Sequence, residues 1–360
     1  MIWNGLLGHD QQVVMFRRSL ERGRLSHAYL LAGIDGIGKK RFALTLAQCL
    51  LCDQIDDQSL DACGQCSGCR QVLAGSHPDL FLITAPDGKR DLPIEAFVGP
   101  KPQRGKAGLC FELSRKPMLG NRKIAVIDDA NLMNEASGNA LLKTLEEPPN
   151  GSLLLLICNN ADGILPTIRS RCQQVHFRPL AATDVVRLLV EQGLAEDDRS
   201  AETVSGLCQG SLATASQLLG SELHSLREDL HGELAQGAKM DSVGLAVRLV
   251  AGVEKLESAG IDQRQGTAWL LDFVTEFYRA VLLQLLGAKP AAAIPQAEEL
   301  AQALGEAVEP SVEIVAALIE CSLDAQQQIA GAIPVGLCLE GLLDALVRVA
   351  GRQQGHIRSA

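Results

Sequence analysis

One short run of this chain has the residue types and the spacing of a phosphate-binding loop. Residues 33–39 read Gly-Ile-Asp-Gly-Ile-Gly-Lys, directly after the apolar stretch 28–32 and directly before a helical pattern. In such a loop the backbone N–H groups surround phosphate oxygens, and the lysine adds a point charge to the outer phosphates. The sequence therefore predicts a nucleotide-binding loop formed by Gly33, Gly36, Gly38 and Lys39.

The same site lacks two side chains on which ATP hydrolysis depends. Lys40 stands where a phosphate loop has the Ser or Thr that holds Mg²⁺. The apolar run 124–127 predicts a strand that ends at Asp128, the position of a metal-associated acid. The next acid is Asp129, where a catalytic Glu is expected, and Asn159 follows a further apolar run, from which it can sense a terminal phosphate. These residues predict weak binding of ATP or ADP and do not favour Mg²⁺.

A second interpretation of this site remains open. The glycines can belong to a relic turn in which they serve packing alone, and Asp129 can be a solvated strand end. In both interpretations the chain lacks the hydroxyl that completes a magnesium site.

The sequence also contains an arginine, Arg171, that could stabilise a phosphoryl group during its transfer. Arg171 lies in the run Ser170-Arg171-Cys172. A guanidinium supplied from a neighbouring subunit stabilises the charge that develops on a transferring phosphoryl group. Arg169 competes for this role, and Arg171 can instead pair with a helix end. A chain that keeps the arginine without the magnesium ligand is predicted to help a neighbour hydrolyse ATP.

Four cysteines have the spacing of a structural metal site. Cys63, Cys66 and Cys69 form two overlapping Cys-x-x-Cys steps, and Cys52 precedes them. Four thiolates suit tetrahedral Zn²⁺, and a site closed by four cysteines is structural. Cys49 competes as the fourth ligand, although its helical position favours a buried thiol. The sequence predicts a zinc module over about residues 49–70, with a set of unliganded thiols as the alternative.

Composition narrows the class of protein. The chain has 360 residues, a formal net charge of −10, 47% hydrophobic and only 3% aromatic residues, so its cores must be aliphatic. The negative charge disfavours broad electrostatic binding to nucleic acid. Eleven clustered cysteines favour a reducing compartment, and the apolar run 153–158 is too short to cross a bilayer. We predict a cytoplasmic protein with several domains, no membrane span and no signal peptide.

The pattern of apolar residues divides the chain into three parts. Residues 1–178 alternate apolar runs with helical patterns, which predicts an α/β domain with a parallel sheet. Residues 179–240 predict a small helical lid, and residues 241–360 predict long amphipathic helices. The predicted strands are 28–32, 80–83, 124–127 and 153–157.

Several runs resemble the bacterial DNA polymerase III clamp-loader subunits of the AAA+ class. The most specific is Asn-Ala-Leu-Leu-Lys-Thr-Leu-Glu-Glu-Pro-Pro at 139–149, and the others are 7–9, 26–31, 75–79 and 165–172. The resemblance covers roughly residues 5–220 and is only architectural beyond them. It implies a RecA-like AAA+ domain with a zinc-binding insertion, an all-α lid and an all-α C-terminal collar that oligomerises. Segment 92–113 fits the family pattern poorly.

Within this family the departures resemble the delta-prime, or stator, type. Lys40, Asp129 and the lack of an arginine near Ala213 separate the chain from the tau/gamma motor type, whereas Arg171 is kept. The resemblance implies an accessory subunit of the DNA polymerase III holoenzyme that hydrolyses ATP poorly or not at all. Arg171 is then a finger that acts in trans. The implied partners are the tau/gamma and delta subunits, with the sliding clamp and primer–template DNA reached through the complex at replication forks.

Two other functions are compatible with these residues. The chain can be an active ATPase motor, if Lys39 and Asp128 suffice for hydrolysis. It can also be a standalone zinc-stabilised AAA+ adaptor outside replication.

Overall fold

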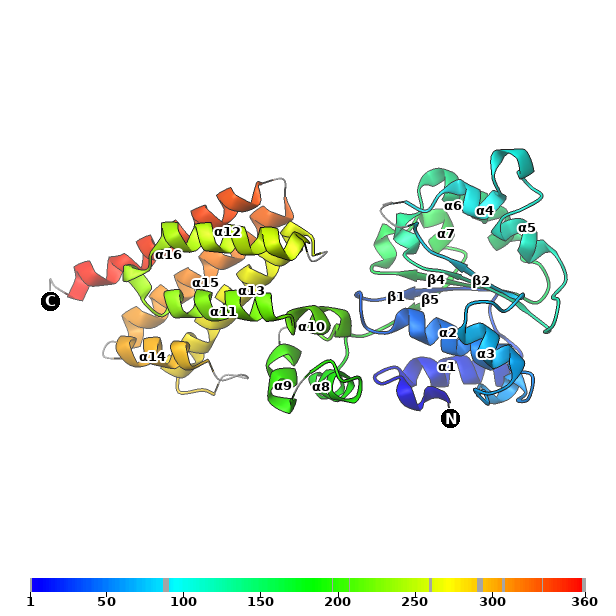
Figure 1. The fold of residues 1–360 in the computed structure, drawn as a ribbon, viewed down its shortest axis with the longest axis horizontal. Helices are drawn as coiled ribbons and strands as arrows, with labels where there is room; N and C mark the ends of the chain where they lie inside the picture. The colour runs from blue at the N-terminus through cyan, green and yellow to red at the C-terminus, as the bar shows by residue number, and fades with distance from the viewer. Residues whose placement is uncertain are drawn as a thin grey trace. The chain divides into compact units, whose positions relative to one another are not determined.

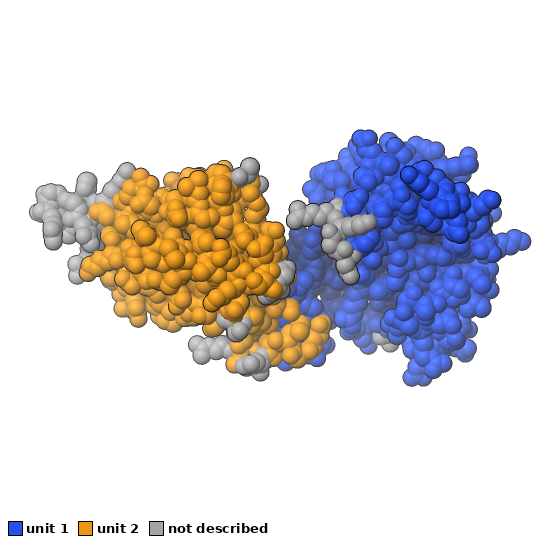
Figure 2. Space-filling view, turned by 45° about the horizontal axis from the view of Figure 1, so that its top comes forward, with its two compact units in different colours: residues 1–191, 209–214 blue, residues 192–208, 215–360 orange. Residues whose placement is uncertain are grey.

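The computed structural model describes residues 2–86, 91–195, 197–206, 208–258, 261–289, 294–305, 308–331 and 333–357. The chain forms two compact units (Figure 2). The first consists of Met1–Glu191 with Gln209–Thr214, and the second of Gln192–Cys208 with Ala215–Ala360. The predicted division into three parts, with boundaries after residues 178 and 240, stays a prediction.

A five-stranded parallel sheet forms the centre of the first unit, with the strand order β2-β3-β4-β1-β5 (Figure 1). The strands are β1 (Ala28–Ala32), β2 (Leu80–Ile83), β3 (Lys123–Ile127), β4 (Ser152–Cys158) and β5 (Gln173–His176). Every residue of β1 and β3 is buried, as expected for parallel strands that are covered on both faces. The four predicted strands are confirmed to within one residue at each end, whereas β5 had not been predicted.

Helices cover both faces of this sheet (Figure 1). On one face lie α1 (Asp10–Glu21), α2 (Lys39–Leu50) and α3 (Ser67–Leu73). On the other face lie α4 (Ile94–Val98), α5 (Leu109–Ser114), α6 (Glu135–Glu146) and α7 (Pro166–Arg169). The helix α8 (Ala182–Glu191) follows the sheet in this unit. Short 3-10 turns span Ile2–Gly5, Asp57–Ser59, Lys101–Gln103, Ala130–Leu132, Ala161–Gly163 and Gly237–Lys239.

Segment 92–113, which fits the family pattern poorly, belongs to the core of the first unit. Leu92, Phe97 and Leu109 are almost completely buried in the same apolar cluster as Leu141 of α6. Burial of three large apolar side chains stabilises the fold by several kcal/mol, at about 1.5–3 kcal/mol for each. The segment therefore closes one face of the sheet.

Asp79 explains why the run Gly-Ser-His-Pro-Asp at 75–79 matters to the fold. Its carboxylate is fully buried and accepts hydrogen bonds from the backbone N–H groups of Met118, Leu119 and Gly120, at 2.7, 2.8 and 3.0 Å. Burial alone would raise the pKa of Asp79, but the three backbone donors together outweigh it and the pKa is lowered. The ionised carboxylate therefore holds the turn that precedes β3.

Replacing Asp79 with Ala should destabilise the first unit by about 3–5 kcal/mol, because three backbone donors lose a buried charged acceptor. A depressed folded pKa means that this stabilisation is fully present above the unfolded pKa of about 3.9 and is lost as pH falls through the folded pKa. Urea unfolding of the two proteins at neutral pH and at pH 3 measures both effects. Asp91→Ala, at an exposed position, is the control and should change stability by less than about 0.5 kcal/mol. An equally small change for Asp79→Ala would contradict the assignment.

The second unit is helical. Its helices are α9 (Asp198–Ser205), α11 (Ser221–Leu234), α12 (Ser242–Ser258), α13 (Gln263–Leu285), α14 (Pro295–Leu304), α15 (Val308–Ala330) and α16 (Val335–Ile357), and α10 (Leu212–Leu218) is shared between the two units. The helix α13 packs against α14 and α15, and α16 packs against α12 and α15. Phe273, Phe277 and Tyr278 are buried in this bundle. The predicted long amphipathic helices are thus confirmed. Over the described ranges, no helix is both long and apolar enough to span a membrane.

Candidate functional site

The phosphate loop connects β1 to α2 at the carboxyl end of the sheet, where α/β proteins bind their ligands. Gly36 and Gly38 have φ angles of +74° and +95°, which favour glycine. A Cβ on Gly33 would lie 2.5 Å from the carbonyl oxygen of Phe177, and one on Gly36 would lie 2.3 Å from Oγ of Ser211. Both the backbone geometry and the close neighbours therefore require glycines here.

Lys39 is directed at its own loop. Its side chain is almost fully buried, and Nζ donates hydrogen bonds to the carbonyl oxygens of Gly33 and Ile34 at 2.5 and 2.7 Å. Nζ also lies 3.6 Å from Oδ1 of Asp35. Burial lowers the pKa of Lys39, and the Asp35 carboxylate partly offsets this effect. The ammonium that would contact outer phosphates is thus held by the loop itself.

Lys40 forms an ion pair with the acid at the end of β3. Its Nζ lies 2.9 Å from Oδ2 of Asp128. Asp129 follows in the left-handed region, with φ +48°, and its N–H donates to Oδ1 of Asp128. Burial and then the charges of Asp128 and Asp35 raise the pKa of Asp129. The position of a magnesium ligand is therefore occupied by a cation that is already paired.

Asn159 reaches the loop from the end of β4. Its Nδ2 donates a 2.6 Å hydrogen bond to Oδ2 of Asp35, the same residue that pairs with Lys39. The structure thus brings the predicted nucleotide-site residues to one edge of the sheet: Gly33, Gly36, Gly38, Lys39, Lys40, Asp128, Asp129 and Asn159. Asp35 was missed, because the variable positions of a phosphate loop carry no signal in the motif.

Two further contacts on the loop come from distant parts of the chain. The His9 ring nitrogen Nε2 lies 2.6 Å from the carbonyl oxygen of Ile37, and burial lowers the pKa of His9. The N–H of Leu212 donates a 2.9 Å hydrogen bond to the carbonyl oxygen of Gly36. For His9 the sequence signal was that residues 7–9 belong to the resemblance.

Arg171 lies between α7 and β5 and is held by the end of α6. Its Nη2 is 2.7 Å from Oε1 of Glu146, and its Nη1 donates to the carbonyl oxygen of Thr167 at 2.9 Å. About a third of the side chain is exposed. The competing Arg169 pairs with Asp162 instead, at 2.5 Å. Each arginine therefore has its own acidic partner.

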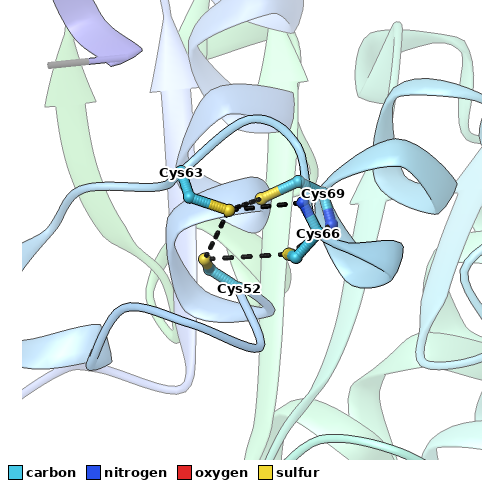
Figure 3. A group of neighbouring side chains, drawn as sticks. All are labelled: Cys52, Cys63, Cys66 and Cys69. Atoms are coloured by element: carbon cyan, nitrogen blue, oxygen red, sulfur yellow. Dashed lines mark hydrogen bonds between the residues drawn. The ribbon is translucent and has the colours of Figure 1, made fainter.

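The four predicted cysteines form one cluster (Figure 3). The sulfurs of Cys52, Cys63, Cys66 and Cys69 all lie within 4.8 Å of one another, and three of the pairs are separated by 3.8–3.9 Å. Four sulfurs at about 2.3 Å from a tetrahedral zinc ion lie about 3.8 Å apart. Cys49 is fully buried in α2, outside this group, and burial raises its pKa to about 12. The four sulfurs can therefore hold a metal ion such as zinc.

Backbone donors support these sulfurs. The N–H of Cys66 donates to Cys63 Sγ and the N–H of Cys69 donates to Cys66 Sγ, both at 3.3 Å. Hydrogen bonds from backbone N–H groups lower the pKa of Cys63 to about 6, whereas burial raises the pKa of Cys69. Asp53 fixes the turn by accepting from the N–H of Gly68 at 2.8 Å. Such outer contacts orient metal ligands.

The sheet order, the phosphate loop after β1 and the helices that follow define an α/β domain with the AAA+ fold, which confirms the predicted fold class. Residues 8–181 match the family model described as DNA polymerase III, delta subunit. This part of the chain, just under half of its length, is therefore similar to that family.

Individual proteins are similar to the chain over parts of its length. The chain is 34% identical over 220 residues to the DNA polymerase III subunit delta′ of Pseudomonas aeruginosa, covering 61% of this chain and 62% of that protein. It is 27% identical over 321 residues to the subunit tau of Salmonella typhimurium, covering 82% of this chain and 47% of tau. A solved gamma subunit-related protein from Thermotoga maritima shares 18% identity over 94% of this chain and 99% of that one, at a TM-score of 0.38. The matches span 45–62% of the length of the first curated delta′ relatives.

Proposed function

We propose that the chain is a delta′-type stator subunit of the DNA polymerase III clamp loader. It supports ATP-driven loading of the sliding clamp onto primed DNA, and it hydrolyses ATP poorly or not at all. One observation carries this proposal: Lys40 is paired with Asp128 where a hydrolysing site needs a magnesium ligand. The sequence similarity to delta′ subunits supports it independently.

In this proposal Arg171 serves the ATP site of a neighbouring subunit. A guanidinium stabilises the charge on the γ-phosphoryl oxygens through planar, charge-assisted hydrogen bonds. Glu146 holds Nη2, the carbonyl oxygen of Thr167 holds Nη1, and the partial exposure of the side chain leaves the guanidinium accessible to a neighbour. Arg171 is therefore the arginine finger, and it acts in trans.

The proposed partners are the tau/gamma and delta subunits, with the sliding clamp and primer–template DNA reached through the complex. The place of action is then the cytoplasm, at replication forks in the nucleoid. Zinc in the cysteine cluster is structural, because all four ligands come from the protein and none is left for a substrate.

Reconstitution tests this proposal. Purified tau/gamma, delta and the present chain should assemble and load a sliding clamp onto primed DNA, and omission of the present chain should abolish loading. A chain that neither joins the complex nor affects loading would instead be a standalone adaptor.

The active motor is the second candidate, favoured by the match to tau over 82% of the chain. Against it, we expect no steady-state ATP hydrolysis by the isolated chain, since Lys39 is bound to its own loop and Lys40 replaces the hydroxyl. Lys40→Thr alone should not start turnover, because Asp129 and the missing arginine near Ala213 remain. Phosphate release, measured beside purified tau/gamma as the positive control, checks both expectations. Robust hydrolysis by the unmodified chain would select the motor.

A further inference from the structure

Two lysines and three aspartates lie at the phosphate loop, and each lysine pairs with a different aspartate. Lys39 faces Asp35 and two loop carbonyls, whereas Lys40 faces Asp128. Asp128 has a side-chain exposure of only 18%, and Lys40 covers it with an ammonium at 2.9 Å. The fifth group, Asp129, lies beside Asp128 in the chain.

This arrangement does not fit a divalent cation. Mg²⁺ and Mn²⁺ take oxygen ligands from carboxylates, hydroxyls, phosphates and water. Position 40 supplies no oxygen, and a metal ion at Asp128 would meet a positive charge already within about 3 Å of the same carboxylate oxygen. A divalent ion must therefore first displace Lys40.

We propose that Lys40 is a built-in cation that takes the place of Mg²⁺ at this loop. It neutralises Asp128, keeps divalent metal out, and makes any binding of a nucleoside di- or triphosphate independent of metal. This inference deepens the proposed stator role, since a loop that recruits no metal cannot assemble a hydrolytic site.

The remaining contacts satisfy carbonyl groups of the loop from within the chain. Lys39 satisfies the carbonyl oxygens of Gly33 and Ile34, and Leu212 satisfies that of Gly36. The Lys39 ammonium could bind a polyphosphate only after its hydrogen bonds to the loop carbonyl groups are broken. Metal-independent binding is therefore also weak.

The first test needs no nucleotide. Mn²⁺ binding is followed by electron paramagnetic resonance, in buffer free of chelator so that the cysteine cluster keeps its metal. The unmodified chain should bind no Mn²⁺ at the loop, whereas Lys40→Thr should gain about one Mn²⁺ per chain, because a hydroxyl and freed carboxylates then face one another. Adding Asp128→Asn to Lys40→Thr should remove this site. Lys255→Thr, at an exposed lysine of α12, is the matched control and should behave like the unmodified chain.

The Mn²⁺-binding measurements decide whether Lys40 excludes divalent metal from the loop. Mn²⁺ binding by the unmodified chain as tight as that by Lys40→Thr would overturn the proposal. If Lys40→Thr binds no Mn²⁺ although it is folded, Lys40 is not what excludes metal, and the proposal is equally wrong. Neither result bears on Arg171 or on assembly, so a failure here is distinct from a failure of the stator function.

A second measurement uses ADP in calorimetry with and without Mg²⁺. The unmodified chain should show the same weak affinity in both buffers, and Lys40→Thr should bind about tenfold more tightly with Mg²⁺ than without it. Binding by the unmodified chain that strengthens tenfold on adding Mg²⁺ would contradict the built-in cation.

Discussion

Replacing Arg171 with Ala should reduce ATP hydrolysis by about 10³- to 10⁵-fold at the one ATP site that it serves in the assembled clamp loader. The loss follows because no other charge replaces the guanidinium at the developing γ-phosphoryl charge. Several ATP sites operate in one complex, so total hydrolysis should fall only in part, and clamp loading should slow. The measurements are DNA- and clamp-stimulated phosphate release and the rate of loading, with assembly checked by gel filtration.

Four further variants make this result specific. Arg171→Lys should rescue poorly, because an ammonium lacks the planar fork. Glu146→Ala should give a smaller loss, since it removes the acid that fixes Arg171 but keeps the charge. Arg187→Ala removes an exposed arginine that is also paired with a glutamate, and it should have no effect. If Arg171→Ala complexes hydrolyse ATP at the unmodified rate while Arg169→Ala complexes fail, Arg169 is the finger.

Purified protein should carry about one zinc ion per chain, and Cys66→Ser should release it. The binding free energy of a structural zinc ion, about 10–16 kcal/mol in zinc-finger peptides at pH 7, also stabilises the segment that it folds. Loss of zinc should therefore loosen residues 52–69 and leave the sheet folded. Elemental analysis gives the zinc content, and hydrogen exchange locates the loosened segment.

Cys321→Ser is the matched control, because Cys321 is a partly exposed thiol outside the cluster, and it should keep zinc. Acidification should also release zinc, since protons compete for the thiolates. With its pKa lowered to about 6, the Cys63 thiol is largely ionised at neutral pH and becomes protonated as pH falls below about 6. Protein prepared without chelator and found free of zinc would end the assignment.

The strands that the sequence predicts are those with continuous apolar runs. In β1 and β3 every residue is buried, so the pattern is unambiguous. The edge strand β5 reads Gln-Gln-Val-His, and only Val175 is buried. An edge strand pairs on one side only and need not be apolar, so composition did not distinguish β5 from a loop.

The site was largely predictable because its motifs end neighbouring parallel strands, whose carboxyl ends meet at one edge of the sheet. That topology brought Lys39, Asp128 and Asn159 together. Asp35 and His9 were not predictable as contacts, since their partners are set by the folded loop. Segment 92–113 was likewise understood only once its apolar residues were seen in the core.

The helix α6 lies in the chain between Asp128, which pairs with Lys40, and the segment that carries Arg171. It begins shortly after Asp128, where Asn134 caps it by accepting from the N–H of Ser137, and it ends at Glu146, which holds Arg171. Its twelve residues form a helix about 18 Å long. In a subunit that binds and hydrolyses nucleotide, a shift of this helix between nucleotide states would also shift the arginine. Under the stator function proposed above, Lys40 stays paired with Asp128 and Glu146 stays bound to Arg171, so a neighbouring subunit would meet the arginine in one position throughout its own cycle.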